Sequence, residues 1–183
     1  MYKKLDEKTM HLILETGIDQ FARFGLDRAN INTIAKAAGV SVGVLYKYFG
    51  DKDSFFLACV RHSLAQLDQV LQEAVAHETD IESGIRSIIS ALIVHAREHQ
   101  CHNALYNEIT SGGCKKYARE LAREIEGSSA AVYARLLENA RRAGTVDPAL
   151  DPQAFAFFLD DLFMMLQFSL RVLSGTYGHF PGG

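Results

Sequence analysis

Residues 30–52 read NINTIAKAAGVSVGVLYKYFGDK, and this stretch decides the fold of the chain. Asn30 stands just before an apolar repeat, where its side-chain oxygen can accept hydrogen bonds from the free backbone N–H groups of the next turn. The repeat has helical spacing, so its members are predicted to face inward: Ile31, Ile34, Ala35 and Ala38.

A tight turn and a second short helix follow this first helix. Gly39 is predicted to end the first helix in the left-handed conformation, which a residue without Cβ adopts at little cost. Ser41 is predicted to cap the second helix, with Leu45 and Phe49 facing inward. Two short helices joined in this way form a helix-turn-helix, whose second helix enters the major groove of DNA.

The stretch IAKAAGVSVGVLYKYFGDKDSFF, residues 34–56, resembles the N-terminal DNA-binding domain of the TetR family of ligand-responsive repressors. The preceding helix, with Phe21, Phe24 and Gly25 at its end, fits the same pattern. The resemblance implies a helix-turn-helix domain over residues 1–52 and a helical ligand-binding and dimerisation bundle over 53–183. The chain departs from the family at Val42, where members often carry Lys or Arg.

The remaining sequence is also predicted to be helical, so the fold class is all-α. The first helix should cover residues 6–24, with an apolar stripe of Met10, Leu14, Ile18 and Phe21 that Ile13, Gly17 and Phe24 widen. Asp51 should cap a long helix that reaches about residue 76. Later helices are expected after a capping box at Thr79, around 104–110, over 116–143 with a possible bend at Gly127, and from Pro152 onward.

DNA contacts are expected from the exposed face of the helix-turn-helix. Gly43 permits close approach, and Val42 or Val44 can touch a thymine methyl group. Tyr46 and Lys47 suit phosphate contacts, which set register without reading sequence. The predicted DNA-contacting residues are Asn30, Asn32, Thr33, Lys36, Val42, Gly43, Val44, Tyr46, Lys47, Tyr48 and Lys52. The alternatives are that Tyr48 is a core aromatic and Lys47 a solvated surface residue.

Charge is distributed unevenly along the chain. The net charge is −3, from 19 basic and 22 acidic residues. Residues 1–52 hold eight Lys and Arg against six Asp and Glu, a net +2, and the remainder has 11 basic and 16 acidic residues, a net −5. A weakly basic front on an acidic body is compatible with DNA binding at one end, although ordinary solvated faces would also produce it.

Two strongly apolar helices near the carboxyl end predict a homodimer, the commonest oligomer. Packed against the same pair of a second subunit, they would form a four-helix interface, as in the family that the chain resembles. The predicted interface residues are Val132, Leu136, Leu137, Phe155, Phe158, Leu162 and Met165. Two subunits should read an inverted repeat, with half-sites about 34 Å or a multiple apart.

The resemblance also implies a small-molecule pocket within residues 53–174, and the apolar and aromatic content favours a hydrophobic or aromatic effector. Phe55 is one suitable lining residue. The other predicted pocket residues are Leu67, Leu92, His95, His99, Tyr106, Tyr133, Phe158, Phe163, Met164 and Phe168. The alternative is that most of these side chains are ordinary core.

Histidines and cysteines gather between residues 95 and 114. His95 and His99 are four residues apart and share one helical face, a spacing that can chelate Zn²⁺, and Cys101 and His102 follow directly. Together with Cys114 they could form a metal or thiol sensor. The alternative is pocket-lining or surface histidines, and no resident metal or cofactor is predicted.

Other function classes have less support. Three cysteines and a start without an apolar segment favour a cytoplasmic protein without a disulfide framework, and Asp160, Asp161, Gln167 and Arg171 interrupt the most apolar run too soon for a membrane span. No phosphate loop or nucleophile motif indicates an enzyme. A helical ligand-binding or scaffold dimer without DNA affinity is the main alternative, and the sequence does not separate repressor from activator.

Overall fold

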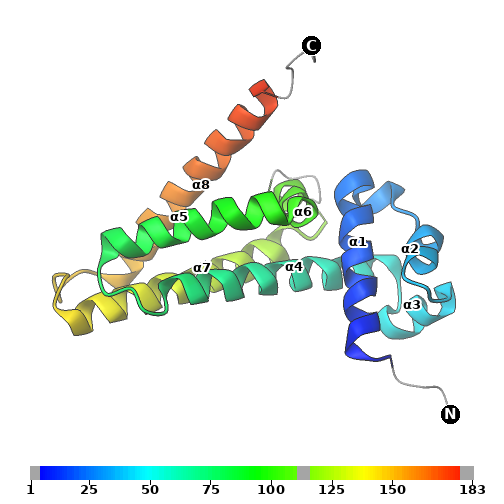
Figure 1. Cartoon of the computed structure of the whole chain (residues 1–183), viewed down its shortest axis with the longest axis horizontal. Coiled ribbons are helices and arrows are strands. Elements are labelled where there is room, and N and C mark those ends of the chain that lie inside the picture. Colours follow the sequence, from blue (N-terminus) through cyan, green and yellow to red (C-terminus); the bar gives the residue numbers. More distant parts are fainter. Residues whose placement is uncertain (1–4, 111–115, 178–183) are drawn as a thin grey trace.

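The computed structural model describes residues 5–110 and 116–177, and all regular structure in these ranges is α-helical (Figure 1). The predicted all-α fold is therefore confirmed. In chain order the helices are α1 (Glu7–Arg28), α2 (Ile31–Ala37), α3 (Val42–Phe49), α4 (Lys52–Val75), α5 (Ile81–Glu98), α6 (Gln100–Thr110), α7 (Ala118–Ala143) and α8 (Pro152–Tyr177).

Helix α1 braces the helix-turn-helix formed by α2 and α3. Asp6 caps α1, because its Oδ1 accepts a hydrogen bond of 2.7 Å from the backbone N of Thr9. Gly25 interrupts the helix with φ +70°, as predicted, but one further turn follows to Arg28. The inward prediction for Phe24 is wrong, because its side chain is 45% exposed. The buried stripe is instead Ile13, Gly17, Ile18 and Phe21.

Helices α1 and α4 cross so closely that Gly17 has no room for a side chain. A Cβ at this position would lie 2.5 Å from Sγ of Cys59 and 2.6 Å from Cζ of Phe55. The Phe21 ring packs against Phe55 and Phe56, with ring centroids 5.6 and 5.1 Å apart. The predicted domain boundary at residues 52 and 53 thus falls at the start of a helix whose first turns are buried in the amino-terminal core.

Helix α4 leaves the amino-terminal domain and runs along α5 and α7 in the bundle (Figure 1). Its predicted cap is confirmed, because Asp51 Oδ1 accepts from the backbone N of Ser54 at 2.7 Å. A second core joins α4, α5, α7 and α8. In this core Gly84 of α5 allows a close crossing, since a Cβ there would lie 2.2 Å from Cδ1 of Leu136 on α7.

The ends of the bundle helices agree in part with the sequence patterns. Asp151 caps α8 and Gly144 ends α7 in the left-handed conformation, as predicted. The capping prediction for Thr79 is wrong by one residue, because the side chain of Asp80 accepts from the Ser83 backbone N. Helix α7 continues through Gly127 without a break. Within the described ranges, no helix combines the length and apolar character that a membrane crossing requires.

Candidate nucleic-acid interface

The helix-turn-helix has the predicted local geometry. Oδ1 of Asn30 accepts hydrogen bonds from the backbone N of Asn32 at 2.9 Å and of Thr33 at 3.4 Å, so it caps α2. Gly39 turns the chain with φ +70°. Ser41 occupies the N-cap of α3, but the predicted capping bond is absent in the described part of the chain. Ser41 was expected only to cap α3, and its exposed side chain lies at the start of this helix.

The predicted DNA-contacting residues lie on one end of the molecule and are mostly exposed. Leu45 is buried and anchors α3, whereas Gly43, Tyr46 and Lys47 face outward. On α2 the side chains of Asn32, Thr33 and Lys36 are exposed. Val42 and Val44 are half-buried, and Val42 packs against the amino-terminal core. The departure from the family pattern at Val42 thus coincides with a packing role.

Tyr48 of α3 makes a contact with the residue that precedes the cap of α1. Its hydroxyl oxygen accepts a hydrogen bond of 2.8 Å from the backbone N of Leu5, and its side chain is 37% exposed. The core-aromatic alternative for Tyr48 is therefore wrong. Because a hydroxyl can donate while it accepts, the proton of Tyr48 remains suited to a phosphate oxygen.

Lys52 is half-buried and already has an intramolecular partner. Its Nζ donates to the backbone carbonyl of Asp27 at 2.8 Å. That carbonyl lies in the last turn of α1, where lysine side chains commonly satisfy free acceptors. An ammonium group has three donors, so this bond still leaves capacity for an anion in front of α4.

The predicted dimer residues differ in their burial. Four of them lie inside the core of the protomer and cannot form a surface, so this part of the prediction is wrong: Val132, Leu136, Leu137 and Phe155. Leu162 is half-buried against the same core. Phe158 and Met165 are exposed on α8, together with Phe157, which was not among the predicted interface residues. Helix α8 contacts α7 and extends away from the other helices (Figure 1).

A small cavity of about 20 Å³ lies between α4, α5 and α6, with room for about one water molecule. Four of the predicted pocket residues line it: Leu67, Leu92, His95 and Tyr106. Tyr133 and Phe163 instead stack on each other in the second core, with ring centroids 5.9 Å apart. Phe158 is exposed, and Phe55 lies in the amino-terminal core. The side chains of Met164 and Phe168 lie outside the described set.

The predicted histidine and cysteine cluster does not assemble as a whole. The rings of His95 and His99 lie 4.7 Å apart, and His102 lies 5.4 Å from His99. Cys101 turns away from them, because its Sγ donates to Oδ1 of Asp19 on α1 at 3.3 Å. Cys114 lies outside the described residues. Burial, together with His99 and His102, lowers the pKa of His95, so this side chain favours the neutral form.

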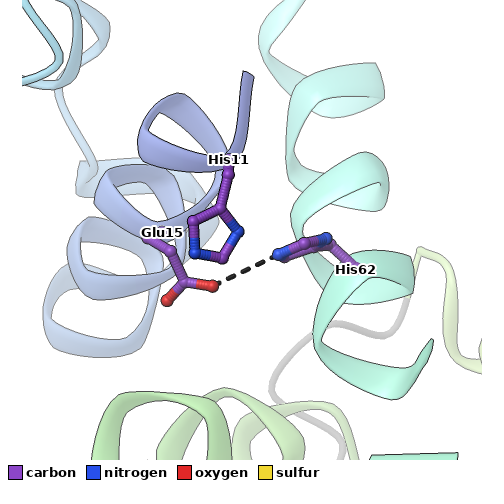
Figure 2. Close-up of side chains that lie close together, drawn as sticks. All are labelled: His11, Glu15 and His62. Carbon is purple, nitrogen blue, oxygen red and sulfur yellow. Dashed lines mark hydrogen bonds and ion pairs between the residues drawn. The ribbon is translucent and has the colours of Figure 1, made fainter. Parts of the chain in front are cut away.

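A different polar cluster joins α1, α4 and α6. The carboxylate of Glu15 lies 2.8 Å from Nε2 of His102 and 3.2 Å from Nε2 of His62, and it accepts from Gln66 at 3.1 Å. His11 lies beside this group on α1, as Figure 2 shows. Burial raises the pKa of Glu15. Hydrogen bonds from His102 and Gln66, and the charge interaction with His102 and His11, lower this pKa by more, so the net shift is downward. Burial also lowers the pKa of His62.

Comparison with known proteins finds a family match at the end of the chain that holds the helix-turn-helix. Residues 13–59 match the model described as "Bacterial regulatory proteins, tetR family". YhgD of Bacillus subtilis, described as an uncharacterized HTH-type transcriptional regulator, is 24% identical over 157 residues, 86% of this chain and 81% of the relative. BetI of Paraburkholderia phytofirmans, an HTH-type transcriptional regulator, is 33% identical over 89 residues. That alignment covers 48% of this chain and only 42% of BetI.

A solved structure shares the whole fold. The transcriptional regulator FadR from Bacillus subtilis, solved in complex with stearoyl-CoA, superimposes with a TM-score of 0.75 at 16% sequence identity. The match covers 92% of this chain and 90% of FadR. This likeness is one of fold and spans both the helix-turn-helix end and the helical bundle.

Proposed function

We propose that the chain is a homodimeric repressor of the TetR family that a small molecule releases from its operator, and the match of residues 13–59 to this family supports the proposal. In this proposal it acts in the cytoplasm as a regulator, not as an enzyme. The single observation that carries the proposal is the outward face of α2 and α3, which presents polar and basic groups on two short helices, of which Asn30 caps the first.

The DNA contacts are proposed from exposure and chemistry. Asn32 and Thr33 can hydrogen-bond base edges or sugar, while Lys36 and Lys47 can neutralise phosphates. Tyr48 can donate to a phosphate because its oxygen is held in place by the backbone N–H of Leu5. One helix-turn-helix makes few contacts, so two copies on an inverted repeat are needed for specific binding.

The proposed dimer uses the outer face of α8. Phe157, Phe158 and Met165 are 69%, 64% and 63% exposed, and an exposed apolar group of this size is typical of a protein interface. Phe158 and Met165 are seven residues apart, so they share one helical face. A second copy of α8, related by two-fold symmetry, would cover these side chains with the same residues.

The proposed effector is a mainly apolar or aromatic molecule that enters beside α4, α5 and α6. Leu67, Leu92 and Tyr106 supply apolar lining, and Ser63, His95 and Asn103 supply a few polar groups. The FadR structure with stearoyl-CoA supports an acyl or similarly apolar ligand as one class to test. Because the cavity holds only about one water molecule, binding must widen it, and that change can move α4 and α6.

Selection of operators from random duplex DNA by the purified full-length chain tests this proposal. We expect enrichment of one inverted repeat whose two half-sites lie on the same face of the duplex. Addition of acyl-CoA compounds and of small aromatic compounds to the selected complex then tests release. A stable dimer that enriches no sequence would instead support the scaffold alternative.

A further inference from the structure

We propose that His11, Glu15 and His62 form a binding site for a divalent transition-metal ion of the Zn²⁺ class, which fastens α1 to α4. Each of the three residues offers one ligand atom, and these atoms all lie within 4.8 Å of one another. Two imidazole nitrogens and one carboxylate oxygen are a ligand set that Zn²⁺ and neighbouring first-row ions favour, and Mg²⁺ does not.

The geometry is close to that of a coordinated ion. Nε2 of His62 and Oε1 of Glu15 lie 3.2 Å apart, and ligand atoms of a tetrahedral zinc site are about 3.3 Å apart when each bond is about 2.0–2.1 Å. The ring of His11 lies 5.3 Å from that of His62, at 67° between the ring planes. His11 is exposed on α1, so its side-chain torsions can adjust to close the remaining distance (Figure 2).

Two neighbours organise these ligands. The amide nitrogen of Gln66 lies 2.9 Å from Nε2 of His62 and 3.1 Å from Oε1 of Glu15, so a hydrogen-bond donor already bridges the two ligand atoms. A cation between them would take over this role and displace Gln66. His102, which is 4% exposed, holds the other oxygen of Glu15 at 2.8 Å and so orients the carboxylate. Such outer partners of a ligand tune metal affinity.

The position of the site gives the ion a mechanical effect. His11 and Glu15 belong to α1, which braces the helix-turn-helix, whereas His62 lies on α4, which continues into the bundle. An ion bound to all three residues stabilises the arrangement in which they meet. Metal binding itself does not require DNA, but use of the ion as a signal rests on the proposed function.

Calorimetric titration of the metal-free full-length chain with ZnCl₂ tests the site. We expect one high-affinity ion per chain, no binding of Mg²⁺, and X-ray absorption showing nitrogen and oxygen ligands only. His11→Ala and His62→Ala should each weaken Zn²⁺ binding by about 100-fold or more, since loss of an outer partner alone typically costs about 10–100-fold. His77→Ala removes an exposed histidine elsewhere and should leave the affinity unchanged.

Thermal unfolding of each variant without metal provides the folding control, and His11→Ala is the decisive variant because its side chain is exposed. Absence of Zn²⁺ binding, or binding that persists in both His11→Ala and His62→Ala, overturns the proposal. Binding that is lost in His99→Ala but kept in His11→Ala assigns the ion to the other histidines and also overturns it. Operator binding by the same metal-free protein tests the proposed function separately.

Discussion

A hydrogen bond of 2.8 Å joins Nε2 of His102 on α6 to Oε2 of Glu15 on α1. His102 also lines the cavity between α4, α5 and α6, and its Nδ1 is a buried nitrogen without a hydrogen-bond partner among the described residues. A polar group of a ligand in an enlarged cavity could therefore bind Nδ1 of the same ring whose Nε2 holds α1. This pair directly links a lining residue of the proposed effector site to α1, which braces the helix-turn-helix.

A double-mutant cycle on this pair should reveal coupling. We expect His102→Leu and Glu15→Leu to show an interaction free energy of about 1–2 kcal/mol. This value lies toward the lower end for hydrogen bonds to charged groups, because the Glu15 side chain is still 32% exposed to solvent. Urea denaturation of the four proteins measures it. The exposed pair Arg86 and Glu82 on α5 is the control and should give about 0.3–0.5 kcal/mol. An equal interaction free energy in both pairs would contradict a specific coupling between His102 and Glu15.

Gly17→Ala should destabilise the fold by about 1–3 kcal/mol, because the added methyl group meets Phe55 and Cys59 where α1 crosses α4. Gly43→Ala is the matched control. A Cβ there meets only Ser41 Oγ at 3.8 Å, an ordinary contact, and alanine favours a helix by about 0.5–1 kcal/mol. Gly43→Ala should therefore keep or raise stability and weaken operator binding. Chemical denaturation and DNA titration of both variants distinguish the two roles.

Lys47→Ala should weaken DNA binding to all sequences by a similar factor and reduce the salt slope by about 1, because one phosphate contact is lost. The measurement is operator affinity at several salt concentrations. Arg142→Ala removes one positive charge from an exposed residue at the far end of α7 and serves as control. An unchanged slope for Lys47→Ala, or an equal loss for Arg142→Ala, would contradict a specific contact at Lys47.

Stability should fall as the solution is acidified below about pH 6.5. Burial and the neighbouring His99 and His102 lower the pKa of His95 below its ordinary 6.5, so the unfolded chain binds its proton at a higher pH than the folded chain does. Where the unfolded state binds more protons, the free energy of unfolding rises with pH. The contribution of neutral His95 to stability is therefore present above pH 6.5 and declines below it. His95→Asn should make urea midpoints less dependent on pH between 7.5 and 5.5.

The matched control for this pH dependence is His77→Asn, because His77 is exposed. His62 contributes a trend of the same sign, since burial lowers its pKa as well. The quantity to compare is therefore the difference between the wild type and each variant. The same slope in wild type and His95→Asn would show that His95 does not carry the effect.

Phe158→Glu should shift the chain from dimer to monomer, because it places a charge in the exposed apolar face of α8. Sedimentation velocity at several protein concentrations measures this shift. Val94→Glu on α5 is the control, since Val94 is also an exposed apolar residue but lies on another helix. A dimer that survives Phe158→Glu and dissociates in Val94→Glu would move the interface to α5.

Local signals in the sequence predicted the helix-turn-helix well. The cap by Asn30 and the turn at Gly39 depend on residues only a few positions apart, and both are confirmed. Side-chain faces were harder to assign on helices that are apolar nearly all round. On α7, Val132 and Leu136 point into the protomer core, a result that depends on how α5 and α8 pack against this helix.

The cluster of His11, Glu15 and His62 between α1 and α4 could be recognised only from the tertiary structure. His11 and Glu15 are four residues apart and share a face of α1, which the sequence does show. His62 lies 47 residues after Glu15, so only the crossing of α1 and α4 brings it into reach. Metal binding was predicted at His95, His99 and Cys101 because their spacing is local, whereas the residues whose ligand atoms converge come from two helices, α1 and α4.

The most direct measurement compares two labelled duplexes, one with both selected half-sites and one with a scrambled half-site, titrated with the full-length chain at fixed salt. The account predicts two chains on the complete operator and an affinity at least about 10-fold lower when one half-site is scrambled, since mismatched base pairs cost about 1–3 kcal/mol each. Equal affinity for both duplexes, or one chain on the complete operator, would contradict a dimer that reads an inverted repeat.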